Sequence, residues 1–393
     1  MRQYIETEIK QINSYRYNST TLAAWNHPDR NFPTNERPMK RFLPLTLFIL
    51  LVALSLACRT AERLVFDDTP TPVPSPTPLP PTHTPVPPTA TPTVTPTSTP
   101  NDCPNGECIV SCVNRLDAIV HPQNKTAPRS SFDEKYTLVT YQIDDDQISQ
   151  PRLSKIPASL KSYQNDSAAQ EEIWDYFAAI IPPDQRRFLT HYQVFTDGRN
   201  NLLANVAQSK NSASQWDLSV DIVDTSDPKD LTFTLVHEFG HLLTLNPDQV
   251  TPSQAIFDHP HSTSVYEKEE RACPNYFPGE GCSHKDSYIN LFVGRFWDKI
   301  YDEWLDIDNI KDDDIHENRL DRFYEKYKDQ FVSDYAPTSP EEDIAESWAF
   351  FILKPKPGNR TIANQKILFF YDFPELIALR EQIARNLCNQ LEK

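Results

Sequence analysis

Alternating apolar and polar positions predict a small number of strands in the middle of the chain. Tyr136–Ile143 is rich in β-branched and aromatic residues and is expected to form a strand, as is the segment His191–Phe195. In Trp216–Val223 every second residue is apolar. That period predicts a half-buried strand, with an edge position in its sheet as one option.

Helical spacing of apolar residues dominates the rest of the chain. Ala168–Ile181 is expected to be a helix that ends before Pro182, and another helix is expected from about Asp184. Further helices are expected at 285–304, 317–331, 339–353, 362–372 and 374–391. The pattern therefore predicts an α+β domain with a small sheet and a largely helical C-terminal half.

The helix expected directly after Trp216–Val223 has clear boundaries. Asp227 is suited to the N-cap, Pro228 to the first helical position, and Asp230 to a contact like that of a capping box. The apolar period continues to about Leu245, before Asn246 and Pro247.

Composition separates a linker from the folded part of the chain. The stretch Thr69–Pro100 holds 13 of the 35 prolines together with 11 threonines. Such a stretch cannot form a core or pair strands, so residues 58–102 are predicted to be a disordered stalk. Residues 103–393 are then expected to form the folded domain.

The segment before the stalk has the layout of a secretory signal. Met39 is followed by two basic residues and an apolar run, Phe42–Leu56, which is shorter than the roughly 20 residues of a membrane span. Residues 39–57 end at Cys58 in a sequence that resembles a bacterial lipobox, so Cys58 is expected to be lipidated. Residues 1–38 are interpreted as a non-native extension, or alternatively as the cytoplasmic tail of a retained signal anchor. Either reading places the domain outside the cell, on the outer face of a bacterial membrane.

The cysteines fit an exported domain with disulfides. Cys273 and Cys282 bracket a turn-rich loop and are expected to pair. Cys388 is expected to pair with one of the first three cysteines of the domain, which are Cys103, Cys108 and Cys112.

Charge and glycine content exclude two classes of ligand. The chain carries 38 basic and 55 acidic residues, and this net charge of −17 disfavours nucleic acid as a partner. Its 7 glycines form neither GxGxxG nor GxxxxGK[ST], so nucleotide-phosphate loops of these two kinds are absent.

The strongest chemical signal is the segment His237-Glu238-Phe239-Gly240-His241. Residues four apart on a helix lie one above the other, so both imidazoles can reach one Zn²⁺. Glu238 is close enough to hold a water on that ion and to act as the general base.

A third ligand is expected from another helix. Metzincin spacing is excluded, because Thr244 and Pro247 stand where a glycine and a histidine would be required. Glu342 and Glu346, four residues apart, fit a ligand and a carboxylate that accepts the N–H of a ligand histidine. Glu341 and Asp343 are further candidates for the ligand.

These motifs together resemble the gluzincin metallopeptidases. The resemblance rests on HEFGH, on the later Glu342-x-x-Ala-Glu346, and on Tyr335 seven residues before Glu342. The most similar pattern is that of the lethal-factor-like group and its bacterial zinc-peptidase relatives. The resemblance covers roughly residues 215–355. The separation of 101 residues between His241 and Glu342 exceeds that of typical members, so substrate class does not transfer.

The resemblance implies a zincin-like fold and one Zn²⁺ held by His237, His241 and Glu342. It also implies Glu238 as the base, and Tyr335 as a donor that steadies the transition state. We therefore expect a membrane-anchored peptidase acting on peptides or proteins. The alternative is a surface-displayed binding lipoprotein in which the zinc is structural or the site is inactive.

Overall fold

The computed structural model describes residues 135–198 and 202–391. The expected signal, the lipidation site Cys58, the stalk and the first three cysteines of the domain lie outside the described residues. Within the described ranges, every helix is too short or too polar to span a membrane.

One five-stranded sheet has the strand order β2-β1-β3-β5-β4, in which β3 and β5 run parallel and the other neighbours antiparallel. The strands are β1 (Tyr136–Asp144), β2 (Gln147–Leu153), β3 (Leu189–Thr196), β4 (Ala204–Gln208) and β5 (Trp216–Asp221). The three predicted strands are therefore present. The sequence pattern did not reveal β2 and β4.

The prediction that Trp216–Val223 is half-buried, with an edge position as one option, is wrong for β5. All six of its residues are buried, and it lies between β3 and β4. Its polar residues have partners: Asp217 accepts a hydrogen bond from Gln193, and Asp221 accepts from the backbone N–H groups of Asp197 and Val223. Alternating apolar and polar residues lie on opposite faces of the sheet, and at β5 the residues on both faces are buried. The edge of the sheet next to it is β4.

Helices α4 (Lys161–Gln164) and α5 (Ser167–Ile180) lie between β2 and β3 in the chain. Helix α5 confirms the helix predicted at Ala168–Ile181. The helix expected from Asp184 is wrong, because only a single 3₁₀ turn forms at Pro183–Gln185. The guanidinium of Arg186 is buried and donates to the carbonyls of Ile181 and Asp145, which directs the chain into β3 instead.

The C-terminal half is largely helical, as expected. The predicted helix at 285–304 is divided at Trp297–Ile300 into α9 and α10, because the Trp297 ring turns into an aromatic core with Trp304 and Phe331. The helices there are α9 (Tyr288–Phe296), α10 (Tyr301–Asp308), α11 (Asp313–Tyr327), α12 (Pro340–Leu353), α13 (Ile362–Phe369) and α14 (Pro374–Leu391).

Residues between the two halves form α7 (Gln254–Asp258), α8 (Thr263–Ala272) and a ribbon of β6 (Val250–Pro252) with β7 (Gly281–Ser283). The predicted Cys273–Cys282 disulfide is present and closes this region. Cys388 is also disulfide-bonded. The cysteines expected as its partner lie outside the described residues.

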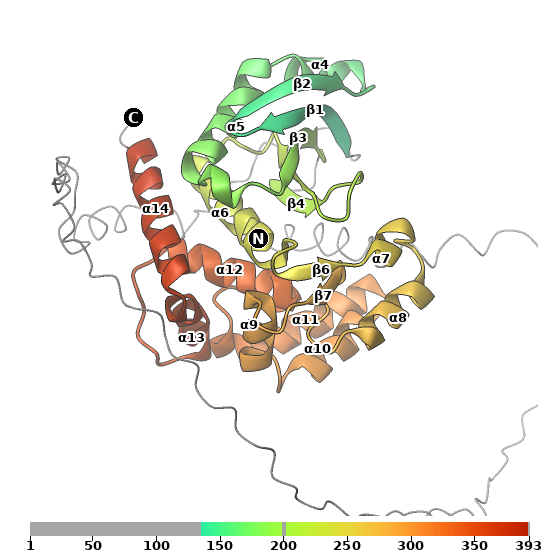
Figure 1. Cartoon of the computed structure of the whole chain (residues 1–393), viewed down its shortest axis with the longest axis vertical. Helices are drawn as coiled ribbons and strands as arrows, with labels where there is room; N and C mark the ends of the chain where they lie inside the picture. Colours follow the sequence, from blue (N-terminus) through green and yellow to red (C-terminus); the bar gives the residue numbers. More distant parts are fainter. Residues whose placement is uncertain (1–134, 199–201, 392–393) are drawn as a thin grey trace, which may run out of the picture. The chain divides into compact units, whose positions relative to one another are not determined.

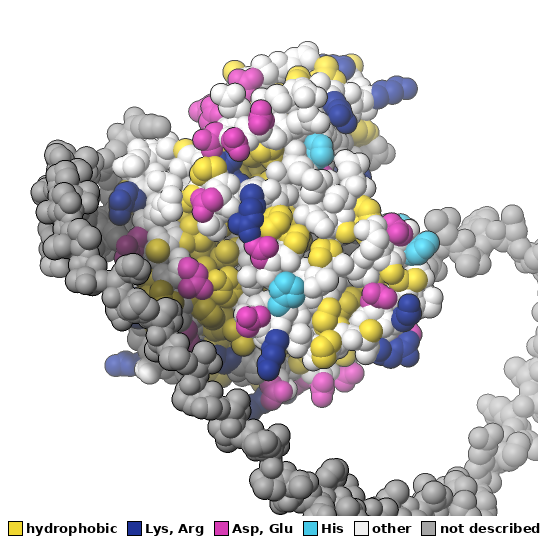
Figure 2. Space-filling model, viewed as in Figure 1, with side chains coloured by type: hydrophobic (Ala, Val, Ile, Leu, Met, Phe, Trp, Pro, Cys, Tyr) yellow, Lys and Arg dark blue, Asp and Glu magenta, His cyan; other side chains and the backbone are white. Residues whose placement is uncertain are grey.

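Helices α6 (Pro228–Leu245) and α12 occupy the junction between the sheet and the C-terminal helices (Figure 1). Strand β4 lies close to α6 on the sheet side, and α9 and α13 lie beyond α12. On the face seen in Figure 2, acidic and basic side chains are interspersed. The fold is thus mixed α and β, with its two halves meeting at α6 and α12.

Candidate metal centre

Helix α6 has the predicted boundaries. The Asp227 carboxylate accepts a hydrogen bond from Lys229 N at 2.9 Å, and Pro228 occupies the first turn. At the other end the side-chain amide of Asn246 donates to Leu242 O at 2.8 Å. Because both ends are fixed by such bonds, the HEFGH segment lies within regular helix and its histidines share one face.

Helix α12 begins where the sequence predicts. Ser339 Oγ accepts a hydrogen bond from Glu342 N at 3.2 Å, which makes Ser339 the N-cap. The cap places three consecutive carboxylates in the first turn, where the positive end of the helix dipole favours them.

The structure separates these three carboxylates by giving each a different partner. Glu341 accepts a hydrogen bond from Tyr276 Oη at 2.7 Å. Asp343 pairs with Lys366 Nζ at 2.5 Å and accepts from Trp297 Nε1. Glu342 faces the two histidines of α6. Of the candidates for the third ligand, Glu342 therefore occupies the right position.

The helices approach closely at Gly240. A Cβ atom at this position would lie 3.0 Å from Trp348 Cδ1 and 3.1 Å from Ala345 Cα. These contacts are shorter than ordinary van der Waals separations, so glycine is required for the observed spacing of α6 and α12. This close approach brings Glu342 within reach of the histidines.

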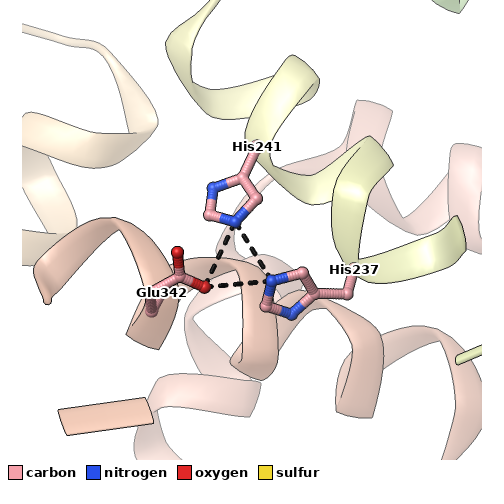
Figure 3. A group of neighbouring side chains, drawn as sticks. All are labelled: His237, His241 and Glu342. Atoms are coloured by element: carbon pink, nitrogen blue, oxygen red, sulfur yellow. Dashed lines mark hydrogen bonds and ion pairs between the residues drawn. The ribbon is translucent and has the colours of Figure 1, made fainter. Parts of the chain in front are cut away.

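The ligand atoms form a small triangle (Figure 3). His237 Nε2 lies 3.0 Å from His241 Nε2 and 3.1 Å from Glu342 Oε2, and His241 Nε2 lies 3.3 Å from the same carboxylate oxygen. All three residues are buried, with His237 4% and Glu342 3% exposed.

This triangle fits a metal ion. Three ligands placed tetrahedrally at about 2.0–2.1 Å from Zn²⁺ leave their donor atoms roughly 3.3–3.4 Å apart. The observed separations of 3.0 to 3.3 Å are close to that value. Two imidazoles and one carboxylate are donors that Zn²⁺ accepts, although the donor set does not identify the metal.

The electrostatics of the site come from burial and from close opposite charges. Burial alone lowers the pKa of His237, but Glu342 and Glu346 outweigh it and raise that pKa well above its ordinary value. Burial raises the pKa of Glu342, but His241 and His237 outweigh it and hold that pKa far below its usual range. The cluster therefore favours positive charge between these side chains, either as protons or as a cation.

Glu346 lies where the sequence predicts. Its Oε1 is 3.0 Å from His237 Nδ1, the nitrogen that points away from the triangle. A carboxylate in this position accepts a hydrogen bond from the Nδ1–H group and leaves the Nε2 lone pair directed at the triangle.

Glu238 is beside the triangle and is 3% exposed. Its Oε2 accepts a hydrogen bond from the backbone N–H of Val206, at 2.7 Å. Burial raises the pKa of Glu238, and the neighbouring His241 and His237 partly offset that increase. A raised pKa suits a group that must take up a proton and release it again.

Tyr335 is also brought to the site. Its ring centroid lies 6.0 Å from that of His237, at an interplanar angle of 52°. The residues expected to carry the chemistry, which come from two distant parts of the sequence, are thus neighbours in the fold.

Two contributors were not predicted from the sequence, namely the Val206 backbone and Gly240. Val206 lies on a short strand with no alternating pattern to mark it. The only signal for Gly240 is its position inside a motif, in a chain with 7 glycines.

A second group of acidic residues was also missed. Asp197, Asp221 and Asp224 each place a carboxylate oxygen within 4.8 Å of the other two. Burial is the main cause that raises the pKa of Asp197 to about 6 and the pKa values of Asp221 and Asp224 to about 7. The sequence signal that could have predicted this group is that β3 and β5, which are parallel neighbours, both end in polar residues.

Comparison of the chain with protein-family models, curated proteins and solved structures found no match.

Proposed function

We propose that this protein is a zinc-dependent metallopeptidase of the gluzincin type. One observation carries the proposal: two histidines and a glutamate form a buried triangle, while a second glutamate lies beside it and a third orients a ligand histidine. A structural zinc site needs four protein ligands, whereas a catalytic one keeps a position for water.

Each residue has a role in this proposal. His237, His241 and Glu342 would hold Zn²⁺, and the bound ion would activate a water and polarise the scissile carbonyl. Glu238 takes the proton of the attacking water and delivers a proton to the leaving amine.

Glu346 keeps His237 in the ligating tautomer through its contact with Nδ1. Tyr335 donates a hydrogen bond to the oxyanion as it develops. Strand β5 lies between β3 and β4, so it has no free edge with which an extended peptide substrate could pair.

We further propose that the enzyme is exported and anchored to the outer face of a bacterial membrane. The support is the signal-like segment before Cys58 and the proline-rich stretch that follows it. The substrates would be peptides or proteins reached from that anchored position. The net charge of −17 argues against nucleic acid.

The test compares wild type with Glu238→Gln in the full chain. Zinc content is measured by elemental analysis and cleavage by mass spectrometry on a peptide library. We expect one zinc per chain in both proteins and cleavage in the wild type alone, because glutamine cannot take up the proton. Equal cleavage by both proteins would rule out Glu238 as the base.

The same measurements distinguish the peptidase from the alternative function. One zinc per chain without cleavage by either protein would favour a surface-displayed binding protein with a structural or inactive site. A folded chain that takes up no zinc would reject both functions.

A further inference from the structure

The register of β4 fixes the direction of its backbone groups. Leu203 pairs with Asp221 and Ser209 with Gln215 through backbone hydrogen bonds at 2.8 and 2.7 Å. Antiparallel neighbours alternate between hydrogen-bonded and non-hydrogen-bonded pairs. Val206, opposite Leu218, therefore belongs to a non-hydrogen-bonded pair. Its N–H points away from β5, across the free side of the strand.

The acceptor on that side is Glu238. Its Oε2 lies 2.7 Å from Val206 N, and the residue is 3% exposed. The bond joins residues 32 positions apart, on an edge strand and on the helix of the two ligand histidines. A carboxylate that accepts an N–H loses most of its rotational freedom, because the donor belongs to a strand held by its neighbour.

We infer that the backbone N–H of Val206 is a positioning group for Glu238, holding its carboxylate in place beside the metal triangle. This inference deepens the proposed function and rests on it for its kinetic consequence. The contact engages Oε2. Within the described residues Oε1 accepts no hydrogen bond, so Oε1 is the oxygen left to take the proton of the attacking water.

The hydrogen bond can be observed without any assay of activity. The full chain, loaded with zinc and labelled with ¹⁵N-valine, gives an amide signal for Val206 that Val206→Ala identifies by its disappearance. A bond to a carboxylate moves an amide proton downfield. We expect this shift in the wild type and its loss in Glu238→Ala, which keeps the ligand histidines.

The kinetic test removes the donor. Val206→Pro deletes the N–H, and proline is tolerated on an edge strand where the N–H makes no ladder bond. We expect kcat to fall about 10- to 100-fold, the loss typical of a hydrogen bond to a charged group, with zinc content unchanged. KM should change little, because the group acts on the base rather than on the substrate.

The matched control is Gln208→Pro. It removes the next N–H that the register directs away from β5, together with the hydrogen bond that the Gln208 side chain donates to Ala213 O, and it leaves the Val206 contact intact. Its kcat should stay within about twofold of wild type, since an edge strand accepts the change. If Val206→Pro does not fold, a backbone ester at position 206 removes the same N–H and keeps the φ freedom of valine.

The outcomes distinguish the two proposals. An amide shift that persists in Glu238→Ala, or a kcat retained without the Val206 N–H, would overturn the inference and leave the peptidase intact. A wild type that cleaves no peptide, with a shift that depends on Glu238, would reject the peptidase and keep the contact. Loss of the downfield amide shift in Glu238→Ala, together with a lower kcat in Val206→Pro, supports the inference.

Discussion

Among single residues, Glu346 offers the most direct test of how the site is organised. It contacts His237 Nδ1 at 3.0 Å and lies outside the ligand triangle. Glu346→Gln keeps the size of the side chain and removes its charge. We expect zinc affinity to fall about 10- to 100-fold, the usual effect of losing such a contact, with one zinc still bound at saturation. Competition with a chelator measures this, and an unchanged affinity would show that Glu346 only fills space.

The group Asp197, Asp221 and Asp224 predicts a pH dependence at the residue scale. The pKa of Asp224 rises from 3.8 to about 7 on folding, first through burial and then through Asp221. Between these values the folded state binds more protons than the unfolded state, so the free energy of unfolding falls as pH rises from about 4 to 7.

Asp224→Asn should therefore stabilise the protein at pH 8, and the gain should shrink as pH falls towards 4. We expect about 1 kcal/mol, much less than the full shift implies, because Asp224 is partly in contact with solvent. Urea unfolding at several pH values measures it, with the exposed Asp175→Asn as control. A gain that does not depend on pH would show that the effect is not ionisation.

The residues of the site were predictable from the sequence to different degrees. Helical spacing was sufficient to place His237, Glu238 and His241 together, because i and i+4 share a face. The spacing of Glu342 and Glu346 had already favoured Glu342 over Glu341 and Asp343 as the third ligand. What only the structure shows is that Glu341 and Asp343 bond to Tyr276 and Lys366, which come from distant elements and have no signal in the local sequence.

Among the elements, the contact between α6 and α12 is the one that assembles the site. Gly240→Ala would place a methyl group 3.0 Å from Trp348 Cδ1 and 3.1 Å from Ala345 Cα. The helices must separate, so we expect a loss of about 1–3 kcal/mol in the free energy of unfolding. Zinc affinity should fall as well, because Glu342 moves with α12.

Gly294→Ala is the matched control for this change. Gly294 is also in a helix, and a Cβ there would meet nothing within 4 Å. Alanine should stabilise that helix by up to about 1 kcal/mol. Chemical denaturation and zinc titration of both variants check the pair. Equal changes in the free energy of unfolding and in zinc affinity for the two variants would mean that the close packing at Gly240 does not set the spacing of α6 and α12.

Helices α6 and α12 were predicted with their correct starts, whereas strands β2 and β4 were not predicted. Helices α6 and α12 begin at Asp227 and Ser339, whose side chains act locally. Strand β4 exists because it pairs with β5, and its own sequence has no clear period. In β5, Asp217 and Ser219 occupy the positions that the alternation assigns to solvent, but both are buried. Burial from a distant segment is not encoded in a local pattern.

For the whole molecule, a metal at this site would join two parts that are far apart in sequence. Helix α6 contacts the sheet through β4, whereas α12 packs against α9, α13 and α14. A cation between His237, His241 and Glu342 would therefore oppose global unfolding and not only local opening. The free energy of unfolding should rise with free zinc, by about 4.1 kcal/mol at a thousandfold excess over Kd.

Two neighbouring glutamates make this prediction specific. Glu342→Gln should remove most of the zinc-dependent gain, because it replaces a ligand carboxylate. Glu341→Gln should keep the gain although its baseline stability is lower, because Glu341 faces Tyr276 at 2.7 Å and not the histidines. Thermal unfolding at fixed free zinc concentrations measures both variants. An equal gain in the two would place the stabilising metal elsewhere in the chain, and a gain lost only in Glu342→Gln would place it between α6 and α12.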